Sequence, residues 1–220
     1  MKQLLTIVFI GLVFTSCGPN KEQIKEEERM RMEAREELEE EKRLEEEKSN
    51  TLTDQRDGKT YKTVKIGNQV WMAENLAFKP SSGNYWAYDD DNSNVAKYGY
   101  LYDWETANNV CPVGWHLPSD NEWTVLTDYL GDEAGTKMKS TSGWKDGGNG
   151  TNESGFNGFP GGCRDYNGDF DGIGYYGYWW SSSEDDTFYA WGRKLGSNFG
   201  GVFSYYGYKA DGFSVRCLRD

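Results

Sequence analysis

The hydrophobic and polar positions divide the chain into stretches of different character. Residues 4–14 form an unbroken apolar or neutral run, which is shorter than the roughly 20 residues of a membrane-spanning helix. Residues 21–48 are mostly Glu, Lys and Arg, without Gly or Pro. From residue 51 short apolar runs alternate with Gly-rich turn signals, which indicates a folded domain.

The charged stretch, residues 21–48, predicts one solvated helix roughly 40 Å long. We expect ion pairs at i,i+4 between Glu27 and Arg31 and between Glu39 and Arg43. The apolar residues do not keep a heptad over three repeats, so we expect a spacer and a monomer. A weak coiled coil that dimerises and a disordered charged tail are the alternatives.

Local signals place the first elements of the domain. Residues 61–72 predict a hairpin around Gly67-Asn68, and residues 102–110 favour a short helix. A capping box over residues 119–122 starts a second helix, which ends at Gly131. One face of that helix carries Trp123, Leu126 and Leu130.

The rest of the chain, from residue 143, is rich in Gly and aromatic residues and predicts short strands and long loops. The final segment alternates, and this predicts a last strand with Phe213, Val215 and Cys217 on its inward face and Ser214 and Arg216 on the other. The fold class is therefore α+β, with few short helices, short antiparallel strands and long loops.

The N-terminus has the order of a secretory signal, with Lys2, the apolar run and small residues before Cys17. Its Phe-Thr-Ser-Cys end resembles the bacterial lipobox, whose cysteine is acylated. That resemblance implies a signal peptide over 1–16, a membrane anchor through lipid on Cys17, a spacer over 17–50 and a domain over 51–220. It also implies a lipid-anchored, extracytoplasmic protein at the bacterial outer membrane or cell surface. Ordinary secretion is the alternative.

The net charge of −12 narrows the classes of partner. Residues 49–220 hold 23 acidic and 15 basic residues, and the chain has no basic run. Because nucleic-acid phosphates and anionic lipid headgroups attract Lys and Arg, we expect the protein to bind neither.

One acidic cluster has the spacing of cation ligands, namely Asp165, Asn167, Asp169 and Asp171, followed by Gly172. Oxygen ligands at alternate residues ahead of a tight turn can hold calcium, although the twelfth position of this loop is Tyr178 and an EF-hand is excluded. A solvated turn is the alternative. The acidic run 89–92 is interpreted as an exposed loop.

His116 is the only histidine, and we interpret it as structural, because no zinc set, catalytic triad or phosphate loop is recognisable. Paired carboxylates for glycoside hydrolysis have no signature in a sequence. Aromatic rings between glycines can stack on sugars or anchor a protein. The candidates for such stacking are Tyr175, Tyr176, Tyr205 and Tyr206.

Several long motifs occur in order, among them IGNQVWMAENL (66–76), CPVGWHLPSDNEW (111–123), YWWSSSE (178–184) and GFSVRCLRD (212–220). Together they strongly resemble the Fibrobacter succinogenes major paralogous domain over about residues 53–220. The resemblance implies a C-type lectin-like fold and a Cys111–Cys217 disulfide. Cys163 departs from the family, which more often has a bulky aromatic residue at this position, and we interpret it as an extra, unpaired and buried thiol. A reactive nucleophile is the alternative.

That family is also distantly similar to formylglycine-generating enzymes, but their cysteine pair is not reproduced here. We therefore expect a non-enzymatic lipoprotein that binds glycan or protein ligands, with no certain cofactor. An enzyme distantly related to the formylglycine-generating group and a structural envelope protein are the alternatives.

Overall fold

The computed structural model describes residues 20–220, with the side chains of 44–49 left aside. The predicted signal peptide over 1–16 and the predicted lipidation site, Cys17, lie outside the described residues. The chain divides into two compact units, of which the second spans Asn50–Asp220. The described part of the first unit is a single helix, and each unit is considered by itself.

Helix α1, Lys21–Ser49, is the charged helix that the composition predicts. Asn20 caps the helix, because its Oδ1 accepts the backbone N–H groups of Glu22 and Gln23. In return, Gln23 Oε1 accepts the backbone N–H of Asn20. Neither predicted ion pair, Glu27–Arg31 or Glu39–Arg43, forms among the described residues. Glu39 pairs with Arg35 instead, and Arg43 pairs with Glu40. No helix among residues 20–220 is long and apolar enough to cross a membrane.

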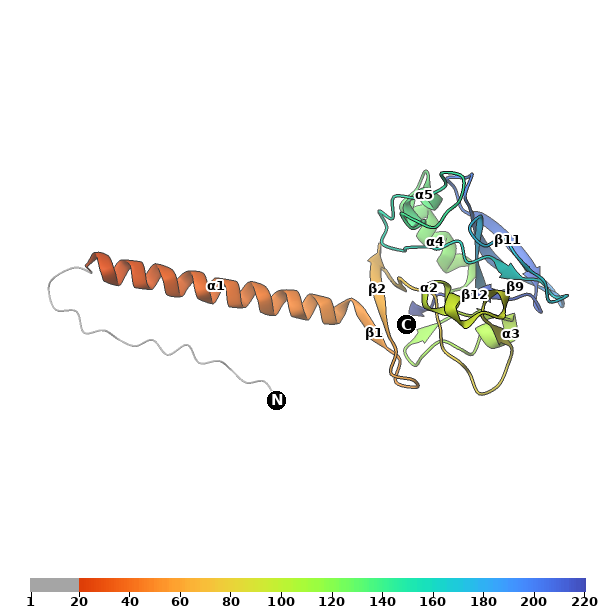
Figure 1. Cartoon of the computed structure of the whole chain (residues 1–220), viewed down its shortest axis with the longest axis horizontal. Coiled ribbons are helices and arrows are strands. Elements are labelled where there is room, and N and C mark those ends of the chain that lie inside the picture. Colours follow the sequence, from red (N-terminus) through yellow and green to blue (C-terminus); the bar gives the residue numbers. More distant parts are fainter. Residues whose placement is uncertain (1–19) are drawn as a thin grey trace. The chain divides into compact units, whose positions relative to one another are not determined.

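The second unit is a mixed α+β domain built mostly from strands in two larger, mainly antiparallel sheets (Figure 1). The five-stranded sheet has the order β1 Thr51–Thr53, β2 Thr60–Ile66, β3 Gln69–Met72, β13 Leu218–Arg219, β6 Trp115–His116. The six-stranded sheet has the order β11 Phe203–Tyr208, β10 Tyr189–Gly196, β9 Tyr176–Glu184, β12 Phe213–Ser214, β5 Leu101–Tyr102, β4 Tyr85–Trp86. A small hairpin pairs β7 Cys163–Arg164 with β8 Phe170–Asp171.

The helices of the domain are short. They are η1 Tyr88–Asp90, η2 Asn92–Asn94, α2 Val95–Tyr98, α3 Trp104–Ala107, α4 Asp120–Leu130 and α5 Ala134–Met138. The capping box of α4 is confirmed in both directions between Ser119 and Glu122, and Trp123 and Leu126 are buried as predicted. The helix predicted over 102–110 is shorter, because Tyr102 belongs to β5 and the Asp103 side chain caps the helix start.

The strands over residues 176–208 are longer than predicted, with 9 residues in β9, 8 in β10 and 6 in β11. Three glycines that suggest turns, Gly177, Gly192 and Gly207, lie inside these strands instead. A Cβ atom on Gly177 would lie 2.4 Å from the Trp179 ring, and one on Gly207 would lie 2.7 Å from the Phe213 ring. Gly177 and Gly207 therefore make room for aromatic rings, and Gly192 makes room for the backbone carbonyl of Trp179 in the neighbouring strand; none of the three serves chain reversal.

The predicted last strand is wrong as a single element. The chain leaves the six-stranded sheet at β12 and joins the five-stranded sheet at β13, and residues 211–218 are buried throughout. Both faces of this crossover are covered, so Ser214 and Arg216 are as buried as Phe213. Cys217 lies between the two strands and forms the disulfide with Cys111 that the resemblance implies.

Candidate ligand-binding groove

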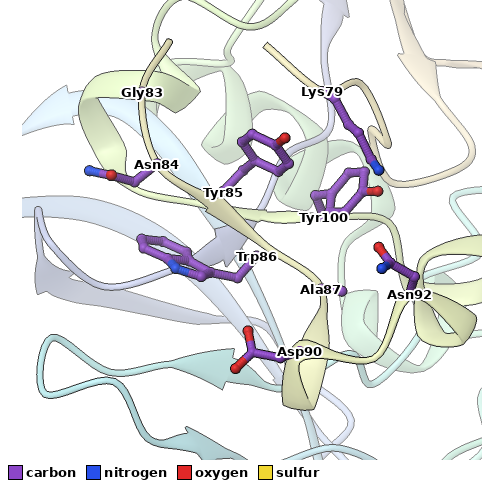
Figure 2. Close-up of a pocket in the computed structure, with 9 residues that line it drawn as sticks. All are labelled: Lys79, Gly83, Asn84, Tyr85, Trp86, Ala87, Asp90, Asn92 and Tyr100. Carbon is purple, nitrogen blue, oxygen red and sulfur yellow. The ribbon is translucent and has the colours of Figure 1, made fainter. Parts of the chain in front are cut away.

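A shallow groove of about 410 Å³ lies along β4, at the edge of the six-stranded sheet opposite β11 (Figure 2). Its lining combines rings, amides, a carboxylate and an ammonium group. The lining residues, which we call the β4 groove, are Lys79, Gly83, Asn84, Tyr85, Trp86, Ala87, Asp90, Asn92 and Tyr100.

Strand β4 is held by pairing with β5, with Tyr85 opposite Tyr102 and Trp86 opposite Leu101. The residue before β4 is fixed as well, because Asn84 donates its backbone N–H to Thr106 Oγ1 and its Nδ2 to Asp103 Oδ2, at 2.9 and 2.6 Å. The groove floor is therefore anchored to helix α3 and its cap.

The rings of the groove are held in place by contacts with neighbouring side chains. The Tyr85 ring packs edge-on against Tyr100, with centroids 5.2 Å apart. The Trp86 ring is covered on one side by the guanidinium of Arg164, whose Cζ is 4.3 Å from the ring centroid. Because these contacts fix the rings before any ligand arrives, little side-chain entropy remains to be lost on binding.

The loop after β4 is tightly turned and hydrogen-bonded. Asp89 and Asp90 both have φ of 55°, a left-handed conformation that Asp and Asn adopt more readily than other non-glycine residues. Asp91 accepts bonds from the backbone N–H and the hydroxyl of Ser93, which lowers the pKa of Asp91. The Asn94 amide donates to the Tyr88 carbonyl. The loop is thus ordered by its own contacts.

Two side chains of this loop have hydrogen-bonding capacity to spare. Among residues 20–220 the Asp90 carboxylate and the Asn92 carboxamide make no hydrogen bond or ion pair. Both are exposed and line the groove. Opposite them, Lys79 lies beside Tyr100, whose hydroxyl raises the pKa of the lysine. The groove offers a donor cation, an acceptor anion and an amide around rings, which is the set that recognises a hydroxylated ligand.

A second aromatic surface lies on β10 and β11. Tyr189 pairs with Tyr208 and Trp191 with Tyr206, and the ring centroids of Tyr189 and Tyr208 are 4.3 Å apart. Tyr166 extends the row, 4.6 Å from Tyr208. We call this row the aromatic ladder. Neighbouring rings are tilted or edge-on to one another, so the ladder is a rough surface rather than a flat platform.

Comparison with known proteins decides the family. The model of the Fibrobacter succinogenes major domain matches residues 64–219, most of the folded domain. The chain belongs to this family. No curated protein and no solved structure matches the chain, so the β4 groove and the aromatic ladder are defined by their own geometry.

Of the four tyrosines predicted to stack on ligands, this Fibrobacter succinogenes major domain brings two together, Tyr176 and Tyr205. Tyr206 belongs to the aromatic ladder and is 54% exposed. Tyr175 is exposed beside Lys145, whereas Tyr176 and Tyr205 are half-buried around the ammonium of Lys194. Their stacking role stays a prediction.

The predicted calcium residues lie on the β7–β8 hairpin. Asp165 Oδ1 accepts the backbone N–H groups of Asn167, Gly168 and Asp169, all at 2.9 Å, and these bonds lower the pKa of Asp165. That carboxylate closes the turn, while Asp171 lies in β8, opposite Cys163. No group of three or more His, Cys, Asp or Glu residues within 20–220 is arranged to hold a metal ion.

His116 is bonded at both ring nitrogens, to Asp220 Oδ1 at 2.7 Å and to Glu122 Oε1 at 3.0 Å. Burial would lower the pKa of His116, but the two carboxylates outweigh it and raise that pKa. Cys163 is unpaired, as predicted, but it is half-buried rather than buried, because it lies in the short β7–β8 hairpin. Burial raises its pKa to about 12. A thiol with so high a pKa is a poor nucleophile at neutral pH.

The sequence did not point to the β4 groove. The acidic run 89–92, which forms one wall of the groove, was predicted only as an exposed loop. Tyr85 and Trp86, on the other wall, belong to no periodic hydrophobic pattern and to no motif. The pairing of β4 with β5 brings the two walls together, and a strand of two residues leaves almost no signal in a sequence.

Proposed function

We propose that this protein is a lipid-anchored, extracytoplasmic binding protein of the bacterial outer membrane or cell surface. Its domain, which we propose to be C-type lectin-like, binds glycan in the β4 groove without catalysing a reaction. Cys17 carries the lipid, and α1 holds the domain away from the membrane. Calcium at the β7–β8 hairpin stays a minor part of this proposal, because Asp165 already serves the turn.

One observation carries the glycan proposal. Asp90 and Asn92 present unused polar groups beside fixed rings, on a loop that is ordered by its own hydrogen bonds. Sugars are recognised by such combinations, since their hydroxyls need both donors and acceptors and their C–H faces pack on rings. No charge of one sign dominates the groove, which favours a neutral glycan.

The test uses the purified full chain on a broad glycan array, followed by calorimetry with the best neutral oligosaccharide. Asn92→Ala and Asp90→Asn should each weaken binding about tenfold, the effect of losing one or two ligand hydrogen bonds. Asn tolerates the left-handed backbone of residue 90, so the loop should keep its shape.

Asp89→Asn is the matched control. Asp89 has the same φ and the same charge as Asp90 but does not line the groove, so this variant should bind like the parent. Equal losses in all three variants, or an array without any neutral ligand, would reject the groove as a glycan site.

A protein ligand is the second candidate, and the aromatic ladder favours it. Tyrosine and tryptophan dominate protein interfaces, and β11 is an edge strand with exposed Tyr206 and Tyr208. Trp191→Ala separates the two candidates. It should leave glycan binding in the groove intact and should weaken capture of a protein ligand on the ladder.

A further inference from the structure

A second hollow of about 350 Å³ lies away from the β4 groove, between β2, the segment after β3, α2 and the loop around residue 157. We call it the cation pocket, because it gathers three basic side chains and one carboxylate. These are Lys59, Lys97 and Arg216, with Glu74. Its other walls include Tyr61, Asn75, Val95 and Phe159.

Arg216 is 1% exposed and has no carboxylate in contact within residues 20–220. Its guanidinium donates Nε to Asn75 Oδ1 at 2.7 Å and Nη1 to the carbonyls of Met72 and Phe156. Nη2 donates to the carbonyl of Asn157 at 3.0 Å. A guanidinium has five N–H donors, so one N–H on Nη2 remains for a group in the pocket.

This burial is costly for the charged arginine. Desolvation lowers the pKa of Arg216 to about 9, and the distant negative charge of Glu74 offsets only part of that effect. Buried cations in proteins are ordinarily paired with an anion. The Glu74 carboxylate instead accepts the backbone N–H of Lys62 at 2.8 Å. The pocket therefore lacks a counter-ion in contact with its most buried charge.

Lys59 and Lys97 add positive charge at the rim. The Lys59 ammonium lies 5.2 Å from the Tyr61 ring centroid, and that of Lys97 lies 4.9 and 5.4 Å from the Tyr98 and Phe159 rings. Neither ammonium forms an ion pair within the described part of the chain. In a domain that is acidic overall, three cations against one carboxylate give this hollow a local positive field.

The backbone of the pocket is also held in an unusual conformation. Asn157 has φ of 54°, and its N–H is fixed by Asn152 Oδ1 at 2.7 Å while its carbonyl accepts from Arg216. Asn tolerates this left-handed region, and the two hydrogen bonds fix the backbone at the wall of the pocket. Val95 and Phe159 supply apolar wall beside the charges.

We propose that the cation pocket is a second binding site, which takes a carboxylate carried on a body of monosaccharide size, as in a uronic acid. The carboxylate meets the free N–H of Arg216 and the two ammonium groups, and the sugar body lies against Val95 and Phe159. The volume is at the lower end of small-ligand pockets, about 300–1,000 Å³, which suits one ring. This site is independent of the β4 groove.

The test is calorimetry of the full chain with glucuronate and galacturonate, with glucose and galactose as uncharged counterparts. A galacturonate oligomer distinguishes a polysaccharide source from a free sugar acid, and inorganic phosphate tests for a bare anion. The sugar acids should bind and the neutral sugars should not. Added salt should lower the affinity for the sugar acids, because it screens the charges. Equal binding of glucuronate and glucose, or of glucuronate and phosphate, would overturn the proposal, as would no binding of either sugar acid.

Three substitutions locate the site. Lys59→Gln and Lys97→Gln should each weaken acid binding about threefold to fivefold, as expected for exposed charges. Glu74→Gln should strengthen it, because the amide keeps an acceptor for Lys62 and removes the opposing charge. Lys145→Gln is the control, since its ammonium also lies on a ring, that of Tyr175, but outside the pocket. A loss in Lys145→Gln equal to that in Lys97→Gln would overturn the assignment.

Discussion

Individual buried polar residues in this domain are not all fully satisfied, and Asp211 is the clearest case. Its Oδ2 accepts the backbone N–H of Tyr208 at 3.0 Å, whereas its Oδ1 is buried with no hydrogen-bond partner in the described residues. Burial raises the pKa of Asp211 to about 6, against a smaller opposite effect of the Tyr208 and Tyr166 amides. An ionised carboxylate there costs stability at neutral pH.

Asp211→Asn should therefore stabilise the protein at pH 7.5 and not at pH 4. A carboxyl whose folded pKa exceeds its ordinary value of 3.8 contributes stability below that value and loses it as pH rises through about 6. The raised pKa of Asp211 corresponds to roughly 2–3 kcal/mol of unfolding free energy, which is the expected difference between the effects of the substitution at the two pH values. Denaturant unfolding at both pH values measures it, and exposed Asp132→Asn is the control. The same gain at pH 4 as at pH 7.5 would contradict this account.

At the scale of elements, the sequence predicted those helices and strands whose contacts join residues close together in the chain. The hairpin of β2 and β3 and the capped start of α4 follow from residues a few positions apart. The strands around Gly177, Gly192 and Gly207 did not, because a glycine that makes room for a ring, as at Gly177 and Gly207, or for a neighbouring backbone, as at Gly192, looks like a turn residue in a sequence. The cation pocket joins positions from 59 to 216, and no local pattern reports such a juxtaposition.

The α4 capping box supports a prediction at this scale. Ser119→Ala removes the hydroxyl that accepts the Glu122 N–H and donates to the Glu122 carboxylate, so the free energy of unfolding should fall by about 1 kcal/mol. Thermal or denaturant unfolding of the full chain gives the value. Ser81→Ala, an exposed serine outside any cap, should change nothing, and an equal effect of the two substitutions would speak against the cap.

For the domain as a whole, the last passage of the chain between the two sheets is fully buried. Residues 211–218 pass from β12 to β13, and this buried segment carries Arg216 of the cation pocket and Cys217 of the disulfide. Two aromatic cores flank it, one with Trp71, Trp123 and Phe156 and the other with Tyr102, Trp180 and Phe213. The crossover therefore couples the sheets, the cores and one candidate site.

The disulfide should contribute strongly because it closes a long loop. Cys111 and Cys217 are 106 residues apart, and restricting the unfolded chain over that length is worth about 4–5 kcal/mol. A Cys111→Ser, Cys217→Ser double variant should lose that amount in denaturant unfolding, and reduction of the parent should lose the same. Cys163→Ser controls for removal of a thiol, since Cys163 is unpaired and half-buried.

Because the loop closed by the disulfide holds α4, β9 and β10, the loss should appear as one transition of the whole domain. A small loss confined to β13 would mean that packing of the crossover, rather than the cross-link, stabilises this part of the domain.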